Sequence, residues 1–226
     1  LEWIVTNDVA TLPIGRGRYA CLCNEAGGII DDAIYYRLDE QEYLLVCNAA
    51  NRRQVVGWLQ RWADGKYPAV SLEDRTQATA MVAFQGPQAA SLLGHLSEGE
   101  LVQLRRFNWA CLRAADISVF AARTGYTGED GFEFIVARED ASRFWRTLAD
   151  AGAPPCGLGA RDILRLEASL VLHGNDIDTS TTPLEVGLEP NKPVSEIGET
   201  HDGFLADPKH FSDDKLRPLH HLQSHA

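Results

Sequence analysis

Residues 19–48 read YACLCNEAGGIIDDAIYYRLDEQEYLLVCN, and this stretch decides the fold class. Three runs within it, at 19–25, 28–37 and 42–48, are rich in β-forming residues that alternate. The turn-forming sequences AGG and DEQE lie between these runs. Strands that follow one another through short turns pair in antiparallel fashion, so we predict a three-stranded meander.

An amphipathic helix is expected next, at residues 51–63, with Asn48 or Asn51 as its cap. Its apolar residues are spaced for one buried face: Val55, Val56, Leu59 and Trp62. Further strands are expected at 78–86, 107–113, 116–123 and 131–137. Further helices are expected at 87–96, 141–151 and 160–170, with Phe144, Trp145 and Leu148 facing inward in the second of them. Runs of strands separated by helices favour an α+β fold of two antiparallel sheet-and-helix units over a parallel sheet.

This organisation divides the chain into three parts. Residues 1–75 form a first subdomain, 76–189 a second subdomain with a return segment, and 190–226 a divergent tail that we expect to be poorly ordered. Five of the seven histidines lie in that tail. Their spacing repeats no ligand pattern, so we predict no metal site.

Composition restricts the class of protein and its partners. The 226 residues are 45% hydrophobic and carry a formal net charge of -11. The Lys and Arg residues that phosphate binding needs are scattered, so nucleic acid is not an expected partner. No stretch reaches the roughly 18 apolar residues of a membrane span, and no secretory signal is recognisable at the start. We therefore expect a cytoplasmic protein, or a mitochondrial matrix protein if the source is eukaryotic, and no membrane partner; the first residue, Leu1, suggests a fragment or a processed product.

The five cysteines are an odd number and contain no CxxC pair. This pattern predicts reduced thiols in an intracellular protein. Cys21 and Cys23 share one face of the first strand, where we expect them to belong to the core.

Two adjacent carboxylates lie inside the apolar run GGIIDDAIYY at residues 27–36. Alternation places Asp32 on one face with Ile30, Ile34 and Tyr36, and Asp31 on the other face with Ile29 and Ala33. A carboxylate among apolar groups loses solvation, which raises its pKa toward the range useful for proton transfer. The alternative is a charged turn or a strand edge.

A third carboxylate, Glu133, lies in GYTGEDGFEF at residues 125–134, where glycines shape a tight loop before a strand. The sequence lacks the Lys-Ser/Thr of a nucleotide loop. Alternation directs Glu133 away from Phe132 and Phe134, so its carboxylate can face a cavity and accept two adjacent N–H donors. A solvent-facing glutamate is the alternative.

Arg161 lies in the first turn of the helix predicted within CGLGARDILRLE, residues 156–167. A cation at a helix start is unfavourable to the helix dipole, so this residue needs an anionic ligand or a salt bridge. Arg165 lies one turn further along the same face. Pairing with Asp162 or Glu167 is the structural alternative for either arginine.

Five motifs together resemble the T-protein family of the glycine cleavage system, the aminomethyltransferases, over residue 1 to about 187. They are NEAGGIIDD, FQGPQAA, RTGYTGEDGFE, CGLGARDILRLEASL and LHGNDIDTSTTPLE, in that order. The resemblance implies two sheet-and-helix domains around a folate pocket. It also implies that an aminomethyl group passes from the lipoyl arm of a carrier protein, the H-protein, to tetrahydrofolate with release of ammonia.

The resemblance further implies a role for each of seven residues. Asp32 would be the catalytic acid beside the folate nitrogens, and Glu133 would bind the pterin. The remaining residues would line the pocket or contact folate: Arg161 by its charge, Asn48 by a hydrogen bond, and Tyr126, Tyr36 and Ile34 as lining. Catalysis would consist of positioning two reactants and moving a proton, without a metal.

The chain departs from the family pattern at both ends. An amino-terminal segment with an Asp-Val-Ser-His-Met motif is missing, and the carboxy-terminal β-barrel is absent after Glu189. Two related alternatives remain open: the folate domain of a sarcosine or dimethylglycine oxidase type enzyme, and a non-catalytic folate-binding relative.

Overall fold

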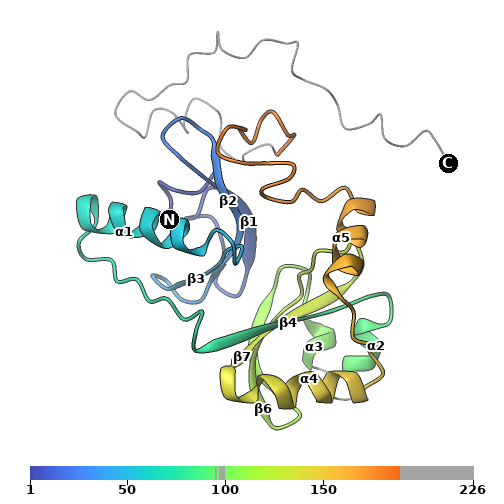
Figure 1. Cartoon of the computed structure of the whole chain (residues 1–226). Coiled ribbons are helices and arrows are strands. Elements are labelled where there is room, and N and C mark those ends of the chain that lie inside the picture. The colour runs from blue at the N-terminus through green and yellow to red at the C-terminus, as the bar shows by residue number, and fades with distance from the viewer. Residues whose placement is uncertain (95, 97–99, 189–226) are drawn as a thin grey trace, which may run out of the picture.

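The computed structural model describes residues 1–94, 96 and 100–188, so the predicted tail at 190–226 lies outside the described residues. The described part contains two separate antiparallel sheets, each with helices packed beside it (Figure 1). The α+β fold expected from the sequence is therefore confirmed. Within the described residues no helix has the length and apolarity to cross a membrane.

The first unit is built on the predicted meander. Strands β1 (Gly17–Cys23), β2 (Ile29–Arg37) and β3 (Tyr43–Val46) form a sheet in the order β1-β2-β3. Helix α1 (Arg52–Lys66) follows and buries Val55 and Ala63. It begins one residue later and ends three residues later than the helix expected at 51–63.

A β-bulge in the first hairpin changes which residues share a face. The pairing of β1 with β2 shifts between Leu22 and Cys23, so that Ile30 has no residue opposite it. We expected Ile30 to lie on the face of Asp32, and this was wrong. Ile30 packs instead in the core that contains Tyr35. Alternation predicts the faces correctly only for residues after the bulge, because the extra residue shifts the side on which the preceding residues lie.

The second unit has a four-stranded sheet in the order β4-β7-β6-β5. Its strands are β4 (Thr79–Gln85), β5 (Trp109–Ala114), β6 (Ile117–Ala122) and β7 (Gly131–Ala137). Its helices are α2 (Ala89–Leu93), α3 (Glu100–Gln103), the 3-10 turn η1 (Arg138–Asp140), α4 (Ala141–Asp150) and α5 (Leu158–Glu167). Only α3 and η1 were not expected from the sequence pattern.

Helix α4 covers the second sheet with one narrow apolar stripe. Phe144 and Leu148 are buried, as expected for residues four positions apart on a helix. Trp145 was expected to face inward, and this was wrong, because 46% of it is exposed. It lies about 100° around the helix from Phe144, beyond the edge of the stripe.

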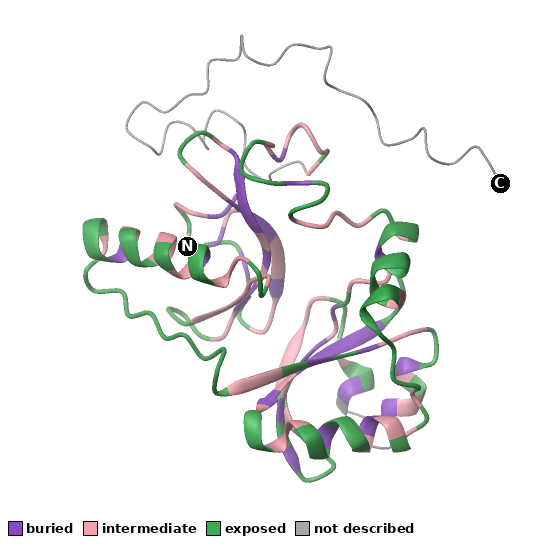
Figure 2. Ribbon diagram, viewed as in Figure 1, coloured by how far each residue is buried: buried purple, intermediate pink, exposed green. Residues whose placement is uncertain are grey.

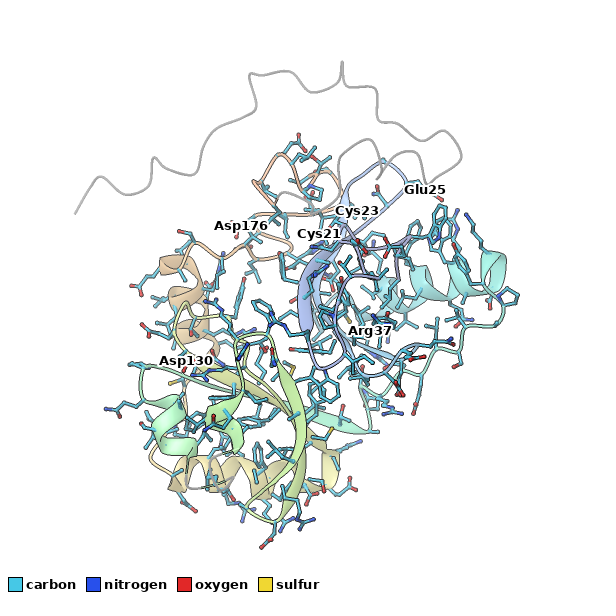
Figure 3. All side chains as sticks on the ribbon, turned by 180° about the vertical axis from the view of Figure 1, so that it is seen from behind. Cys21, Cys23, Glu25, Arg37, Asp130 and Asp176 are labelled. Carbon is cyan, nitrogen blue, oxygen red and sulfur yellow. The ribbon has the colours of Figure 1, made fainter. Side chains whose placement is uncertain are left out.

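The two units are joined directly by backbone and side-chain hydrogen bonds. The amide of Gly17 on β1 donates to the carbonyl of Phe107, just before β5, at 2.7 Å. The indole Nε1 of Trp109 donates to the carbonyl of Arg37 at 3.2 Å. Arg37 lies where the ribbons of the two units meet (Figure 3). These contacts fix one sheet against the other and so determine the shape of the space between them.

A return segment, residues 168–188, leads from α5 back to the first sheet (Figure 1). The amide of Ile29 lies 3.0 Å from the carbonyls of both Asp178 and Thr181. Ile177 is buried with Cys21 and Ile29, which places Cys21 in the core as expected. Figure 2 shows the buried residues running along both sheets, whereas α5 is mostly exposed. The second subdomain therefore ends against the first one.

Candidate functional site

A cavity of about 1500 Å³ lies between the two units. It is lined from β1, β2, the segment after β3, the loop between β6 and β7, β7, α5 and the return segment. All seven site residues expected from the sequence line this cavity: Asp32, Ile34, Tyr36, Asn48, Tyr126, Glu133 and Arg161. Residues far apart in the sequence are thus brought together around one space.

The carboxylate of Asp32 lies in the cavity and is held by two donors. The hydroxyl of Tyr19 donates to its Oδ2 at 3.2 Å, and Nδ2 of Asn48 donates to its Oδ1 at 2.9 Å. Burial raises the pKa of Asp32 above its ordinary value, and the neighbouring charge of Asp31 raises the pKa further. The two hydrogen bonds oppose this rise. The result is a carboxylate that takes up a proton more readily than an exposed one.

Asp31 points away from the cavity and is fully buried. Its Oδ2 accepts the backbone N–H of Asn48 at 2.9 Å, and its Oδ1 accepts Nδ2 of Asn48 at 2.8 Å and Nδ2 of Asn51 at 2.6 Å. The opposite orientation of the two aspartates agrees with the alternation of the strand. We expected Asn48 or Asn51 to cap α1. Asn51 occupies the cap position but its side chain makes no capping bond; its Nδ2 donates to Asp31.

Tyr19 is a site residue that the sequence analysis missed. It lines the cavity and contacts Asp32. Burial raises the pKa of Tyr19, and the charge of Asp32 raises it further, so the phenol stays protonated and acts as a donor. The sequence does indicate on which side of the strand Tyr19 lies. Tyr19 precedes Cys21 by two residues, so alternation places both side chains on one face.

Glu133 ends a chain of three side chains that crosses between the units. The hydroxyl of Thr124 donates to Oε2 of Glu133 at 2.6 Å, and the hydroxyls of Thr124 and Tyr36 lie 3.1 Å apart. A threonine hydroxyl has a single proton, so Tyr36 must be the donor to Thr124. Burial raises the pKa of Tyr36, and the charge of Glu133 adds to the effect. On the opposite face of β7, Phe132 and Phe134 are buried in the core, as expected.

The two arginines of α5 have different environments. Arg165 is buried and pairs with Asp162 at 2.8 Å, as the structural alternative predicted. It also pairs with Asp176 at 2.5 Å, a partner that was not expected from the sequence. Asp176, which tethers the return segment to this helix, is labelled in Figure 3. The guanidinium of Arg161 lies 4.7 Å from the ring centroid of Tyr126 and forms no ion pair within residues 1–94, 96 and 100–188. Arg161 is therefore a cation at the cavity wall that can attract an anion.

The loop between β6 and β7 holds Tyr126 against the return segment. The hydroxyl of Tyr126 donates to the carbonyl of Val171. Arg123 closes the loop by pairing with Asp130 at 2.6 Å. A Cβ on Gly125 would lie 1.7 Å from Oε1 of Gln85, so any other residue there would displace the Gln85 side chain. Close packing thus fixes the loop that carries Tyr126 into the cavity.

Two antiparallel sheet-and-helix units around a shared, carboxylate-lined cavity are the arrangement that the T-protein resemblance implied. The sequence model of the GCVT N-terminal domain family matches residues 1–190. The chain belongs to this family.

Individual relatives and one solved structure agree with this assignment. The chain is 48% identical over 184 residues to an aminomethyltransferase of Thermus thermophilus, covering 81% of this chain and 52% of the relative. It is 45% identical over 193 residues to an aminomethyltransferase of Geobacillus thermodenitrificans, covering 83% and 52%. The crystal structure of glycine cleavage system aminomethyltransferase T from Bartonella henselae matches with a TM-score of 0.75 and 36% identity, over 88% of this chain and 53% of that one. The chain spans about half the length of the curated relatives it matches.

Proposed function

We propose that this chain carries the folate-binding and catalytic residues of an aminomethyltransferase of the glycine cleavage system. The reaction moves a one-carbon unit from an aminomethylated lipoyl carrier protein, the H-protein, to tetrahydrofolate and releases ammonia. One observation carries the proposal: Asp32 and Glu133, from different sheets, line the same cavity. The names of the relatives and the family match support it.

Glu133 is the proposed pterin-binding residue. A pterin offers an amino group and a ring N–H side by side, and a carboxylate is the acceptor that matches two such donors. Thr124 occupies one oxygen of Glu133 and thereby orients the carboxylate. Tyr36 donates to Thr124 and keeps that hydroxyl turned toward Glu133.

Asp32 is the proposed proton carrier of the reaction. When the CH2 group becomes bonded to both folate nitrogens, it loses its bonds to the amine nitrogen and to sulfur. The two folate nitrogens give up two protons, of which the departing ammonia takes one and the lipoyl sulfur the other. A carboxylate whose pKa is raised by burial accepts a proton more readily than an exposed one and can then return it.

The other lining residues complete the proposed site. Asn48 would hydrogen-bond folate, Tyr126 and Ile34 would pack against it, and Arg161 would attract its anionic end. The proposed reaction uses tetrahydrofolate as a co-substrate and no metal. We propose that it takes place in the cytoplasm, or in the mitochondrial matrix if the source is eukaryotic. Residues 1–75 and 76–189 would supply the two halves of the site.

The decisive experiment measures ammonia release from aminomethylated carrier protein with the 226-residue chain, with and without tetrahydrofolate. We expect folate to accelerate release, and Asp32→Asn to lower the folate-dependent rate by about 10²- to 10⁴-fold. Asp39→Asn, which removes an exposed carboxylate after β2, is the matched control and should leave the rate unchanged. Release that folate does not accelerate would contradict the transferase proposal.

A second candidate is a folate binder without transferase activity, which the same carboxylate-lined cavity would also suit. A thermal shift on addition of tetrahydrofolate separates the candidates, because a ligand that binds only the native state must stabilise it. A thermal shift without accelerated ammonia release supports the binder. Glu133→Gln should lose the thermal shift in either case.

A further inference from the structure

We propose that Asp31 is a positioning residue for Asp32: its buried carboxylate fixes Asn48, and Asn48 in turn holds the Asp32 carboxylate in the cavity. This inference deepens the proposed function and rests on it, since it assigns a role at the same site. Asp31 does not line the cavity, so it is not a catalytic residue.

The geometry around Asn48 carries the proposal. Its backbone N–H and its Nδ2 both donate to Asp31, at 2.9 and 2.8 Å, and these two bonds fix its main chain and its side chain together. The same Nδ2 lies 2.9 Å from Oδ1 of Asp32. An amide has two N–H donors, so one can point to each aspartate. Asn48 thus links the two carboxylates across the strand.

Asn51 completes the environment of Asp31. Its Nδ2 donates to Oδ1 of Asp31 at 2.6 Å, so the carboxylate accepts three N–H donors in all. A fully buried carboxylate needs such donors to remain ionised. Asn51 lies at the start of α1, so the contact also ties this end of the helix to β2.

The titratable groups that interact electrostatically with Asp32 come from three elements. Tyr19 and Cys21 lie on β1, Asp31 on β2, and Tyr126 on the loop between β6 and β7. Burial raises the pKa of Tyr19, Cys21 and Tyr126, so these three groups are neutral near pH 7. Among the groups described here Asp31 is therefore the charged neighbour of Asp32, and its charge favours protonation of Asp32.

The first test uses the unmodified chain and needs no activity. The side-chain carboxyl carbons of 13C-labelled aspartate are followed by NMR as the pH is lowered, with Asp32→Asn used to assign the signals. We expect Asp32 to take up its proton at a pH above the ordinary pKa of an aspartate, because burial and the charge of Asp31 both favour its protonated form. An Asp32 that titrates at or below that ordinary value would overturn the proposal, because the carboxylate would then not be held beside Asp31 in the buried position that the geometry assigns to it.

The second test is Asp31→Asn, in which one acceptor oxygen becomes a donor that faces the N–H groups of Asn48 or Asn51. We expect the titration of Asp32 to move to lower pH, and kcat for folate-dependent ammonia release to fall at least ~10-fold with KM for folate changed less than ~3-fold. Asp39→Asn is the matched control. A role in stability alone would lower the melting temperature but leave the titration of Asp32 unchanged in the folded protein, and that result would overturn the proposal.

The two tests separate this inference from the proposed function. If the chain releases no ammonia but Asp32 titrates as expected, the transferase proposal fails and the positioning of Asp32 by Asp31 stands. If ammonia release depends on folate and on Asp32 but is unchanged in Asp31→Asn, the positioning role fails and the transferase stands. If Asp31→Asn does not fold, the titration of the unmodified chain decides.

Discussion

The hydroxyls of Tyr36 and Thr124 lie 3.1 Å apart, and this contact connects the two halves of the molecule. Thr124 receives a hydrogen bond from Tyr36 of the first sheet and donates one to Oε2 of Glu133, on the second sheet, at 2.6 Å. The three buried polar groups satisfy one another, so removal of the middle one leaves both ends unpaired.

Thr124→Val is therefore expected to lower the free energy of unfolding by about 1–3 kcal/mol, because it leaves a buried hydroxyl and a buried carboxylate without partners. Urea denaturation measures the change. Thr147→Val on α4 is the control, since that hydroxyl bonds only to the backbone of its own helix, and its effect should stay within about 0.5 kcal/mol. Equal losses in the two variants would show that the connection between the sheets contributes nothing.

Gly28→Ala is expected to destabilise the protein by about 1–3 kcal/mol through overpacking. A Cβ on Gly28 would lie 1.8 Å from the carbonyl oxygen of Thr179, so the return segment would have to move off the first sheet. Gly57→Ala, at an exposed position of α1 with nothing near its Cβ, should instead stabilise by about 0.5–1 kcal/mol. Thermal denaturation of both variants checks the prediction, and a harmless Gly28→Ala would contradict the close contact.

Asp32→Asn is expected to raise the melting temperature at pH 7 relative to the unmodified chain. The pKa of Asp32 is raised in the folded state, so its contribution to stability is present at low pH and is lost as the pH rises above its ordinary value of 3.8. The amide carries no charge and avoids that loss. Melting temperatures measured at pH 4 and pH 7 should show a larger advantage of the variant at pH 7, and an advantage confined to pH 4 would refute the sign.

Tyr19→Phe is expected to raise the pKa of Asp32 further, because the hydroxyl that stabilises the carboxylate is removed. The direction is opposite to that expected for Asp31→Asn, where a like charge is lost. NMR titration of the labelled carboxyl measures the change, with Tyr43→Phe on β3 as the control. A titration curve of Asp32 that does not move would exclude Tyr19 as its partner.

The sequence predicted the strands, most of the helices and the seven cavity residues, because these depend on local alternation and on ordered motifs. The misplaced face of Ile30 has a different origin, since a β-bulge is set by the pairing of two strands and not by the composition of one. Trp145 was misplaced because periodicity does not give the width of the buried stripe. The hydrogen bond from Asn51 to Asp31 depends on how α1 packs against β2. The residue pattern of one helix or one strand does not contain that information.

The contact between His173 and the carbonyl of Ile29 spans 144 positions of the chain. This separation determines when the cavity can form during folding. A nascent chain on the ribosome can pair β1 with β2 early, since that hairpin is local. The wall supplied by the return segment can form only after residues 171–181 have been synthesised and have reached the backbone of Ile29. Among the described residues, the wall of the cavity is therefore completed late in synthesis, after the first sheet has packed its own core.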